Sequence, residues 1–223
     1  MAKSKPHTAK DSSGKFIRRK AALIVFEGID GAGSTTQTGL LFNYLKSKGK
    51  KVIKTCEPTD GPVGQLIRRA LKHELKFSWE TLQLMYSADR ADHLDKLILP
   101  STRAGKTVIS DRYFFSTLAY GELNLDGKWL RELGKNFPMP SATFLIDTPV
   151  SVAMKRMESS RGSKELFERQ SFLEKVRDNY LKQAKEFSFY VLDGTKTKGE
   201  IAKEVLEVLK KKEICDGNMS LDD

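Results

Sequence analysis

The sequence predicts an α/β fold in which short parallel strands alternate with longer helices around one buried core. Short apolar runs rich in β-branched residues recur along the chain, and longer amphipathic segments lie between them. This alternation is typical of βαβ units, whose strands are buried on both faces and therefore read as almost continuously apolar. A length of 223 residues with 39% hydrophobic side chains is enough for one domain of this kind.

Five apolar runs predict the strands of the sheet. In chain order they are 23–26 (LIVF), 52–56 (VIKTC), 107–110 (TVIS), 143–146 (TFLI) and 190–192 (YVL). Helical spacing of apolar residues predicts the helices between and after them, over 35–47, 63–72, 79–99, 114–121, 128–133, 150–157, 167–186 and 198–212. Parallel strands present ligands at their carboxyl ends, so the residues after each strand are the first candidates for chemistry. A carboxylate follows each of the first four strands, namely Glu27, Glu57, Asp111 and Asp147. Asp193 follows the fifth strand.

The charge of the chain is concentrated at its beginning. The sequence has 39 Lys and Arg against 29 Asp and Glu, and a net charge of +10 by itself favours a polyanionic partner. Residues 1–20 hold seven of the basic side chains and one Asp, so six of the ten net charges lie there. This segment has few large apolar side chains, which predicts a basic, disordered tail. The rest of the chain has no evident DNA- or RNA-binding module, so a nucleic-acid partner is not favoured.

One domain is expected over 21–212, between the tail 1–20 and a C-terminal tail 213–223. Inside it, the polar segment 158–164 (ESSRGSK) predicts a flexible loop between two helices. No apolar run near the N-terminus is long enough for a secretory signal or a membrane span. The chain has only Cys56 and Cys215, which supports neither a disulfide framework nor a zinc site. These features favour a cytoplasmic protein without a membrane partner.

The segment after the first strand has the spacing of a phosphate-binding loop. Its residues are Gly28, Ile29, Asp30, Gly31, Ala32, Gly33, Ser34, Thr35 and Thr36. Glycines allow backbone N–H groups to turn toward one centre, and the start of the next helix adds its positive end, so phosphates can be held there. Thr35 would place a hydroxyl on Mg²⁺. A glycine-rich turn without a ligand is the alternative, although the strand before the loop and the helix after it favour a nucleotide site.

The loop lacks the lysine that this motif normally carries. Ser34 occupies that position, which removes the cation that bridges the outer phosphates of the donor. One hypothesis is that the loop 158–164 supplies a replacement as a lid, with Arg161 first and Lys164 second. The other is a nucleotide-binding protein with little or no phosphoryl transfer.

Five segments in order resemble the thymidylate kinase family: FEGIDGAGSTTQ, EPTDGPVGQLIRRAL, LMYSADRADHL, SDRYFFSTLAYGE and FLIDTPVSVAMKR. The resemblance extends over residues 22–212, and DRY followed by Ser-Thr-x-x-Tyr is far more specific than the phosphate loop. It implies a P-loop NTPase fold with a five-stranded parallel sheet flanked by helices, and usually a homodimer. It also implies transfer of the γ-phosphoryl group of ATP to dTMP with Mg²⁺, a step toward dTTP.

Tyr86 and Arg90 are the candidates for recognising the acceptor base. They are four residues apart in a predicted helix and so share one face. A flat ring can stack on a pyrimidine, and a guanidinium can reach a carbonyl oxygen of the base. The resemblance implies these two roles. Core packing for Tyr86 and a surface role for Arg90 remain the alternative from spacing alone.

The segment after the third strand is the candidate for phosphate and metal binding. Arg112 is expected to bind the acceptor 5′-phosphate, and Asp111 to bind Mg²⁺ directly or through water. A buried structural Asp–Arg pair is the alternative. With Arg112, the resemblance implies an acceptor pocket formed also by Asp30, Glu57, Arg68, Ser116, Thr117 and Tyr120, the last of them crowding the 2′ position of the sugar.

No general base is needed, because a positioned oxygen of the acceptor phosphate is already a nucleophile. Catalysis is therefore expected from Asp30, Arg112, Arg161 and Lys164. The histidines, His93 among them, are expected on the surface or on a helix face. The resemblance puts the adenine pocket at Asp193, Gly194 and Thr195.

Overall fold

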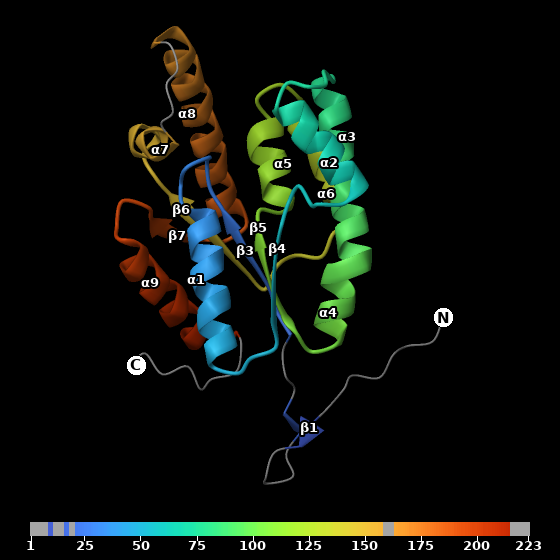
Figure 1. Ribbon diagram of the computed structural model, residues 1–223, viewed down its shortest axis with the longest axis vertical. Coiled ribbons are helices and arrows are strands. Elements are labelled where there is room, and N and C mark those ends of the chain that lie inside the picture. The colour runs from blue at the N-terminus through green and yellow to red at the C-terminus, as the bar shows by residue number, and fades with distance from the viewer. Residues whose placement is uncertain (1–8, 11–15, 18–20, 158–162, 215–223) are drawn as a thin grey trace.

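The fold is a five-stranded parallel sheet with helices on both faces, as the computed structural model in Figure 1 shows. The structure describes residues 9–10, 16–17, 21–157 and 163–214, with side chains over 21–157 and 170–214. The strands of the sheet are β3 (Leu23–Glu27), β4 (Val52–Cys56), β5 (Thr107–Asp111), β6 (Ala142–Asp147) and β7 (Tyr190–Asp193). Their spatial order is β4-β5-β3-β6-β7. This confirms the predicted fold class, and each strand lies within one residue of its predicted bounds.

Nine α-helices and one π-helical segment are assigned in the described part of the chain. They are α1 (Ser34–Ser47), α2 (Pro62–Leu71), α3 (Trp79–His93), η1 (Leu94–Ile98), α4 (Leu99–Arg103), α5 (Phe114–Gly121), α6 (Gly127–Gly134), α7 (Val150–Met157), α8 (Ser163–Glu186) and α9 (Lys198–Lys211). Figure 1 shows α1 and α9 side by side on one flank of the sheet, where α1 packs on β3, β4 and β5. On the other flank, α4 packs on β5 and α8 packs on β6.

The predicted single helix over 79–99 is divided in three. The α-helix α3 ends at His93, a π-helical turn spans Leu94–Ile98, and α4 continues to Arg103. Pro100 lies in the first turn of α4, and proline has no N–H to donate to the helical ladder. The regular hydrogen-bonding pattern therefore cannot run unbroken through this region.

Parts of the predicted tails and lid lie outside the described residues. Near the N-terminus, Ala9–Lys10 (β1) pairs antiparallel with Phe16–Ile17 (β2). The remainder of the predicted tail, residues 158–162 of the predicted lid and residues 215–223 are not among those described. The division into tails and one domain stays a prediction. No helix in the described ranges is both long enough and apolar enough to span a membrane.

The central strands are fully buried, and this fixes where the site can form. Every residue of β3 and β5 is buried, and Phe26 stacks on Phe144 of β6 with ring centroids 5.2 Å apart. Polar side chains therefore gather where the strands end. Phe26 lies opposite Asp111 in the parallel register, so Glu27 and Asp111 emerge at the same edge of the sheet.

Candidate active site

The phosphate loop has the geometry that its glycines require. Gly31 and Gly33 have φ angles of 81° and 109°, a region that side chains other than glycine rarely adopt. A Cβ on Gly28 would lie 3.0 Å from the backbone oxygen of Ile146, so the loop also packs closely on β6. The loop leads directly into α1, whose first residue is the buried Ser34. The loop itself thus provides backbone N–H groups and a helix N-terminus but no ammonium group.

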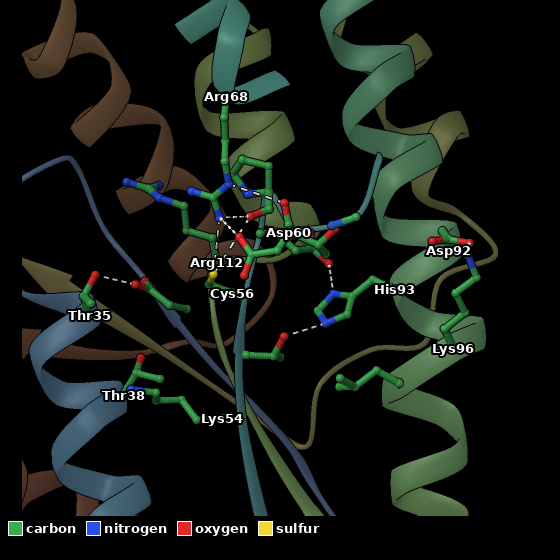
Figure 2. Close-up of a pocket in the computed structure, with 17 residues that line it drawn as sticks. Thr35, Thr38, Lys54, Cys56, Asp60, Arg68, Asp92, His93, Lys96 and Arg112 are labelled. Carbon is green, nitrogen blue, oxygen red and sulfur yellow. Dashed lines mark hydrogen bonds and ion pairs between the residues drawn. The ribbon is translucent and has the colours of Figure 1, made fainter. Parts of the chain in front are cut away.

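Thr35 and Asp111 lie together at the start of α1 and the end of β5. The Thr35 hydroxyl donates to Asp111 Oδ2, as the dashed line at Thr35 in Figure 2 marks. The second oxygen, Asp111 Oδ1, is buried and has no hydrogen-bond partner among the described residues. A buried carboxylate oxygen without a donor beside a hydroxyl suits a hard cation, because Mg²⁺ prefers oxygen ligands. These two side chains therefore fit Mg²⁺.

Arg112 is the centre of a dense network of polar groups. Its Nη2 donates to Asp30 Oδ1 at 2.7 Å, and its Nη1 donates to the hydroxyls of Ser116 and Tyr180, both at 3.1 Å. Its Nη2 also lies 3.5 Å from the hydroxyl of Tyr120. Burial alone would lower the pKa of the Arg112 guanidinium, but the surrounding phenol and carboxylate groups raise it well above its usual range. The guanidinium therefore stays charged.

The backbone of Arg112 is in an unusual conformation. Its φ angle is 74°, a left-handed value that is uncommon for a residue other than glycine and costs about 1 kcal/mol or more. The Arg112 N–H is held by the Phe26 carbonyl at 2.8 Å, which anchors the turn to β3. Backbone strain of this kind is concentrated at functional sites, where surrounding contacts maintain it.

All but one of the predicted acceptor residues line one cavity of about 270 Å³ between α3 and α5. The predicted residues on its walls are Asp30, Glu57, Tyr86, Arg90, Arg112, Ser116, Thr117 and Tyr120. The remaining walls are largely apolar or aromatic, and they come from Pro58, Leu71, Trp79, Leu82, Gln83, Tyr113 and Phe172. Such a pocket, apolar with a few placed polar groups, is typical of a small-molecule site. Spacing had a signal for three of the missed residues, because Trp79, Leu82 and Gln83 continue the helix face of Tyr86 and Arg90.

Arg90 is among the most deeply buried side chains of the described structure, at 1% exposed. Its Nε forms an ion pair with Glu57 Oε2 at 2.7 Å, and its Nη1 donates to Thr117 Oγ1 at 3.2 Å. Its guanidinium also lies 5.4 Å from the ring centre of Tyr113. The surface alternative for Arg90 is therefore wrong. The ion pair and Thr117 hold the guanidinium in the cavity wall.

His93 lies on a helix, one of the two positions expected for it, but it is not at the surface. It lies at the end of α3, but it is buried rather than exposed, and its Nδ1 lies 3.0 Å from Glu57 Oε1. Its Nε2 lies 2.7 Å from Thr55 Oγ1 (Figure 2). His93 thus supports Glu57 from the side opposite Arg90. Sequence spacing could not reveal this, because Glu57 and His93 belong to different elements.

Arg68 does not line the 270 Å³ cavity. It lines a larger neighbouring cavity of about 840 Å³, drawn in Figure 2, which also includes Thr35, Asp111 and Arg112. Its Nη2 donates to the Pro58 carbonyl at 2.5 Å and lies 3.5 Å from Asp60 Oδ1. Arg68 thus holds the corner that follows β4, where the Glu57–Pro58 peptide bond is cis.

On the donor side, the structure links the phosphate loop to the loop after β7. Arg156 of α7 donates to the carbonyls of Ala32 at 3.1 Å and Gly194 at 2.9 Å. Asp193 accepts hydrogen bonds from the N–H and hydroxyl of Thr195, which forms the turn expected to meet the adenine. Arg161 lies outside the described residues, and Lys164 lies in α8 without a described side chain.

Glu27 at the end of β3 was noted in the sequence only as one of several strand-end carboxylates. It is fully buried and accepts hydrogen bonds from the Tyr113 N–H, the Ser116 hydroxyl and the Tyr180 hydroxyl. Burial raises the pKa of Glu27 to about 7, although Arg112 and these hydrogen bonds act in the opposite direction. Tyr180 itself was missed, because a tyrosine among apolar helix positions reads as core.

Comparison with known proteins agrees with this geometry. A family model described as thymidylate kinase matches residues 26–205. A protein named "Probable thymidylate kinase" from Thermococcus kodakarensis is 46% identical over 173 residues, which cover 74% of this chain and 84% of that protein. A protein named "Thymidylate kinase" from a Sulfurihydrogenibium species is 41% identical over 200 residues, which cover 86% of this chain and 98% of that protein. The match extends through the loop, the acceptor cavity and the last strand, and the chain belongs to the thymidylate kinase family.

Proposed function

We propose that this kinase transfers the γ-phosphoryl group of ATP to the 5′-phosphate of dTMP, giving dTDP and ADP for nucleotide biosynthesis. The observation that carries the proposal is the cavity between α3 and α5. One wall offers a buried guanidinium and aromatic rings to a base, and Arg112 joins the cavity to Asp30 of the phosphate loop. A nucleoside monophosphate with its base against that wall and its phosphate at Arg112 has the phosphate facing the donor.

The base end of the cavity suits thymine. Burial raises the pKa of the Tyr86 phenol, so its ring is neutral and can stack on the base. The Nε and Nη1 groups of Arg90 bond to Glu57 and Thr117. Nη2 has no hydrogen bond to any of the residues described, so we propose that it donates to a carbonyl oxygen of the base. Tyr120 borders the sugar and disfavours a 2′-hydroxyl, which supports a deoxyribonucleotide acceptor.

At the phosphate end, Arg112 binds and orients the acceptor phosphate, whose oxygen is the nucleophile. Asp30 is half exposed and can release Arg112 to the incoming phosphate, while its own carboxylate turns to a metal bound there. Thr35 and Asp111 would hold Mg²⁺, which supplies charge neutralisation for the donor phosphates when it is bound. The backbone N–H groups of the loop hold those phosphates, and Arg156 keeps the loop and the turn after β7 together.

A coupled assay with ATP, Mg²⁺ and a panel of nucleoside monophosphates tests the proposed reaction. We expect ADP production above background with dTMP, a turnover of about 1 s⁻¹ or more, and a much lower kcat/KM with the ribonucleotides. Absence of ADP production with dTMP above the no-acceptor background would contradict the reaction. If dTMP and ATP then still bind in a calorimeter, the protein is a nucleotide-binding protein that lost transfer with its P-loop lysine.

We propose further that Arg161 replaces the missing lysine, with Lys164 as the second candidate. Arg161→Ala is expected to lower kcat about 100-fold with little change in KM for dTMP, since the cation acts on the moving phosphoryl group. Arg103→Ala, an exposed arginine at the end of α4, is the matched control. An unchanged kcat would assign the role to Lys164 or another cation.

Ser34→Lys is expected to change the rate only modestly, and a large gain would mean that no replacement cation exists.

We also propose that the kinase is a cytoplasmic homodimer. The side chains of Leu66 on α2 and Leu84 on α3 are 41% and 50% exposed, and exposed apolar groups on neighbouring helices support association. Light scattering on the purified protein measures this, and a particle mass near 25.2 kDa at micromolar concentration would contradict the dimer.

A further inference from the structure

Glu27 is a buried carboxylate that the proposed reaction does not use directly. It is 0% exposed and, within the described part of the chain, it is not a wall residue of either site cavity. Its Oε1 accepts from the Tyr113 N–H at 2.9 Å. Its Oε2 accepts from Ser116 Oγ at 2.7 Å and from the Tyr180 hydroxyl at 2.9 Å. Burying a carboxylate costs free energy, so a fully buried glutamate is expected to have a role that offsets this cost.

Both of these hydroxyls also contact Arg112. Ser116 Oγ and Tyr180 OH each accept from Arg112 Nη1 at 3.1 Å, so two hydroxyls lie side by side between the carboxylate and the guanidinium. A hydroxyl has one hydrogen and two lone pairs. When both hydrogens point to Glu27, both oxygens turn lone pairs toward Arg112. The two hydroxyl oxygens are only 2.8 Å apart and could instead bond to each other, so an ionised acceptor is what fixes their direction.

The two sides of Arg112 differ in their exposure. On one side Nη2 bonds to Asp30, whose side chain is 52% exposed and lies at the phosphate loop. On the other side Nη1 donates to Tyr180, which is fully buried like Glu27, and to Ser116, a half-buried wall residue of the 270 Å³ cavity. An incoming phosphate can displace the exposed contact to Asp30 but not the contact to the buried Tyr180. The φ angle of Arg112 is positive, so its backbone is strained and needs surrounding contacts to hold it. Bonds that fix the Arg112 side chain are contacts of this kind.

We propose that Glu27 is a positioning residue that orients Arg112 toward the acceptor phosphate through the hydroxyls of Ser116 and Tyr180. This rests on the proposed contact between Arg112 and that phosphate. Glu27 does not touch the substrate, and no proton transfer to or from it is part of the reaction.

The network depends on the protonation state of Glu27. Among the described residues, Tyr180 is the ionisable group that bonds to Glu27, and Arg112 acts on Glu27 electrostatically across the two hydroxyls. Arg112 in turn contacts Asp30 and Tyr120. Because burial raises the pKa of Glu27 to about 7, the carboxyl is largely protonated below that pH. A protonated carboxyl oxygen donates a hydrogen where it now accepts one, so a hydroxyl loses the acceptor that keeps its hydrogen away from Arg112.

Glu27→Gln is the decisive variant. The fixed Tyr113 N–H requires the amide oxygen, so the amide NH₂ faces the two hydroxyls and donates to them. The hydroxyls then lose the acceptor that keeps their hydrogens away from Arg112. We expect kcat/KM for dTMP to fall about 30-fold, in line with loss of a hydrogen bond to a charged group, while KM for ATP stays within about twofold. The ratio of wild-type to variant kcat/KM should rise between pH 6 and pH 8 and then level off. A merely structural role of Glu27 would not lower kcat/KM for dTMP while sparing KM for ATP, and it would not produce this pH dependence.

Three further variants make the outcome unambiguous. Tyr180→Phe removes one hydroxyl and should lower kcat/KM for dTMP in the same direction but less, and it serves if Glu27→Gln fails to fold. Glu207→Gln, an exposed glutamate on α9, is the control and should leave all constants unchanged. Wild-type dTMP constants in both Glu27→Gln and Tyr180→Phe would overturn the role of Glu27. If Arg112→Met also leaves KM for dTMP unchanged, the result contradicts the proposed contact between Arg112 and the acceptor phosphate, on which the role of Glu27 rests.

Discussion

Replacing Arg112 with methionine is expected to lower kcat/KM for dTMP about 1,000-fold. The substitution removes the guanidinium that bonds to Asp30 and to the hydroxyls of Ser116, Tyr180 and Tyr120. It also leaves Asp30 facing an anionic acceptor, and the buried Glu27 behind it, without the cation between them. Removing one partner of a hydrogen-bonded charge pair costs about 2–5 kcal/mol, and each 1.4 kcal/mol is a factor of ten.

Steady-state kinetics with varied dTMP and saturating ATP measure this effect, and thermal unfolding followed by circular dichroism checks the fold. Arg103→Met is the control and should keep wild-type constants, because Arg103 is exposed at the end of α4. Arg112→Lys should recover only a small part of the loss. One ammonium group cannot reach Asp30, the hydroxyl pair and a phosphate with the fork geometry of a guanidinium. A value for Arg112→Met within threefold of wild type would exclude Arg112 from acceptor binding.

The sequence predicted the sheet well because its physical signal is local. A strand buried on both faces must be apolar throughout, and LIVF and TVIS have this property without reference to any other segment. The same holds for the phosphate loop, where glycines are required by positive φ angles and close packing. Strand-end carboxylates were also visible, because parallel topology brings all such ends to one edge.

The support behind the site could not be predicted in the same way. Tyr180 and Glu27 are 153 residues apart, and their contact depends on how α8 packs against α5 and β6. His93 was expected at the surface or on a helix face, because a lone histidine on a helix carries no pattern that identifies a partner. Its contact with Glu57 arises only when the end of β4 meets the end of α3. Arg68 was assigned to the acceptor pocket from the family resemblance, and that role stays a prediction. The structure places it in the neighbouring 840 Å³ cavity with Arg112, where its guanidinium also holds the Pro58 carbonyl.

Asp111→Asn is expected to lower kcat about 1,000-fold while KM for dTMP changes little. The substitution keeps the shape of the side chain and an oxygen for the Thr35 hydroxyl, but it removes the negative charge and places an NH₂ where Oδ1 now lies without a partner. An amide nitrogen cannot be a ligand of Mg²⁺, and charge stabilisation by a bound metal is worth several kcal/mol in phosphoryl transfer. The effect should therefore fall on the donor side of the reaction rather than on acceptor binding.

Calorimetry separates this metal role from a structural Asp–Arg pair, the alternative that the sequence left open. No ion pair between Asp111 and Arg112 is present among the described residues, since Arg112 pairs with Asp30 instead. In the wild type, Mg²⁺ should tighten ADP binding, and in Asp111→Asn this gain should be largely lost while metal-free ADP binds equally well. Asp95→Asn, an exposed aspartate on η1, should behave as wild type. An unchanged gain from Mg²⁺ in Asp111→Asn would instead mean that the metal is held by Thr35 and the nucleotide without this carboxylate.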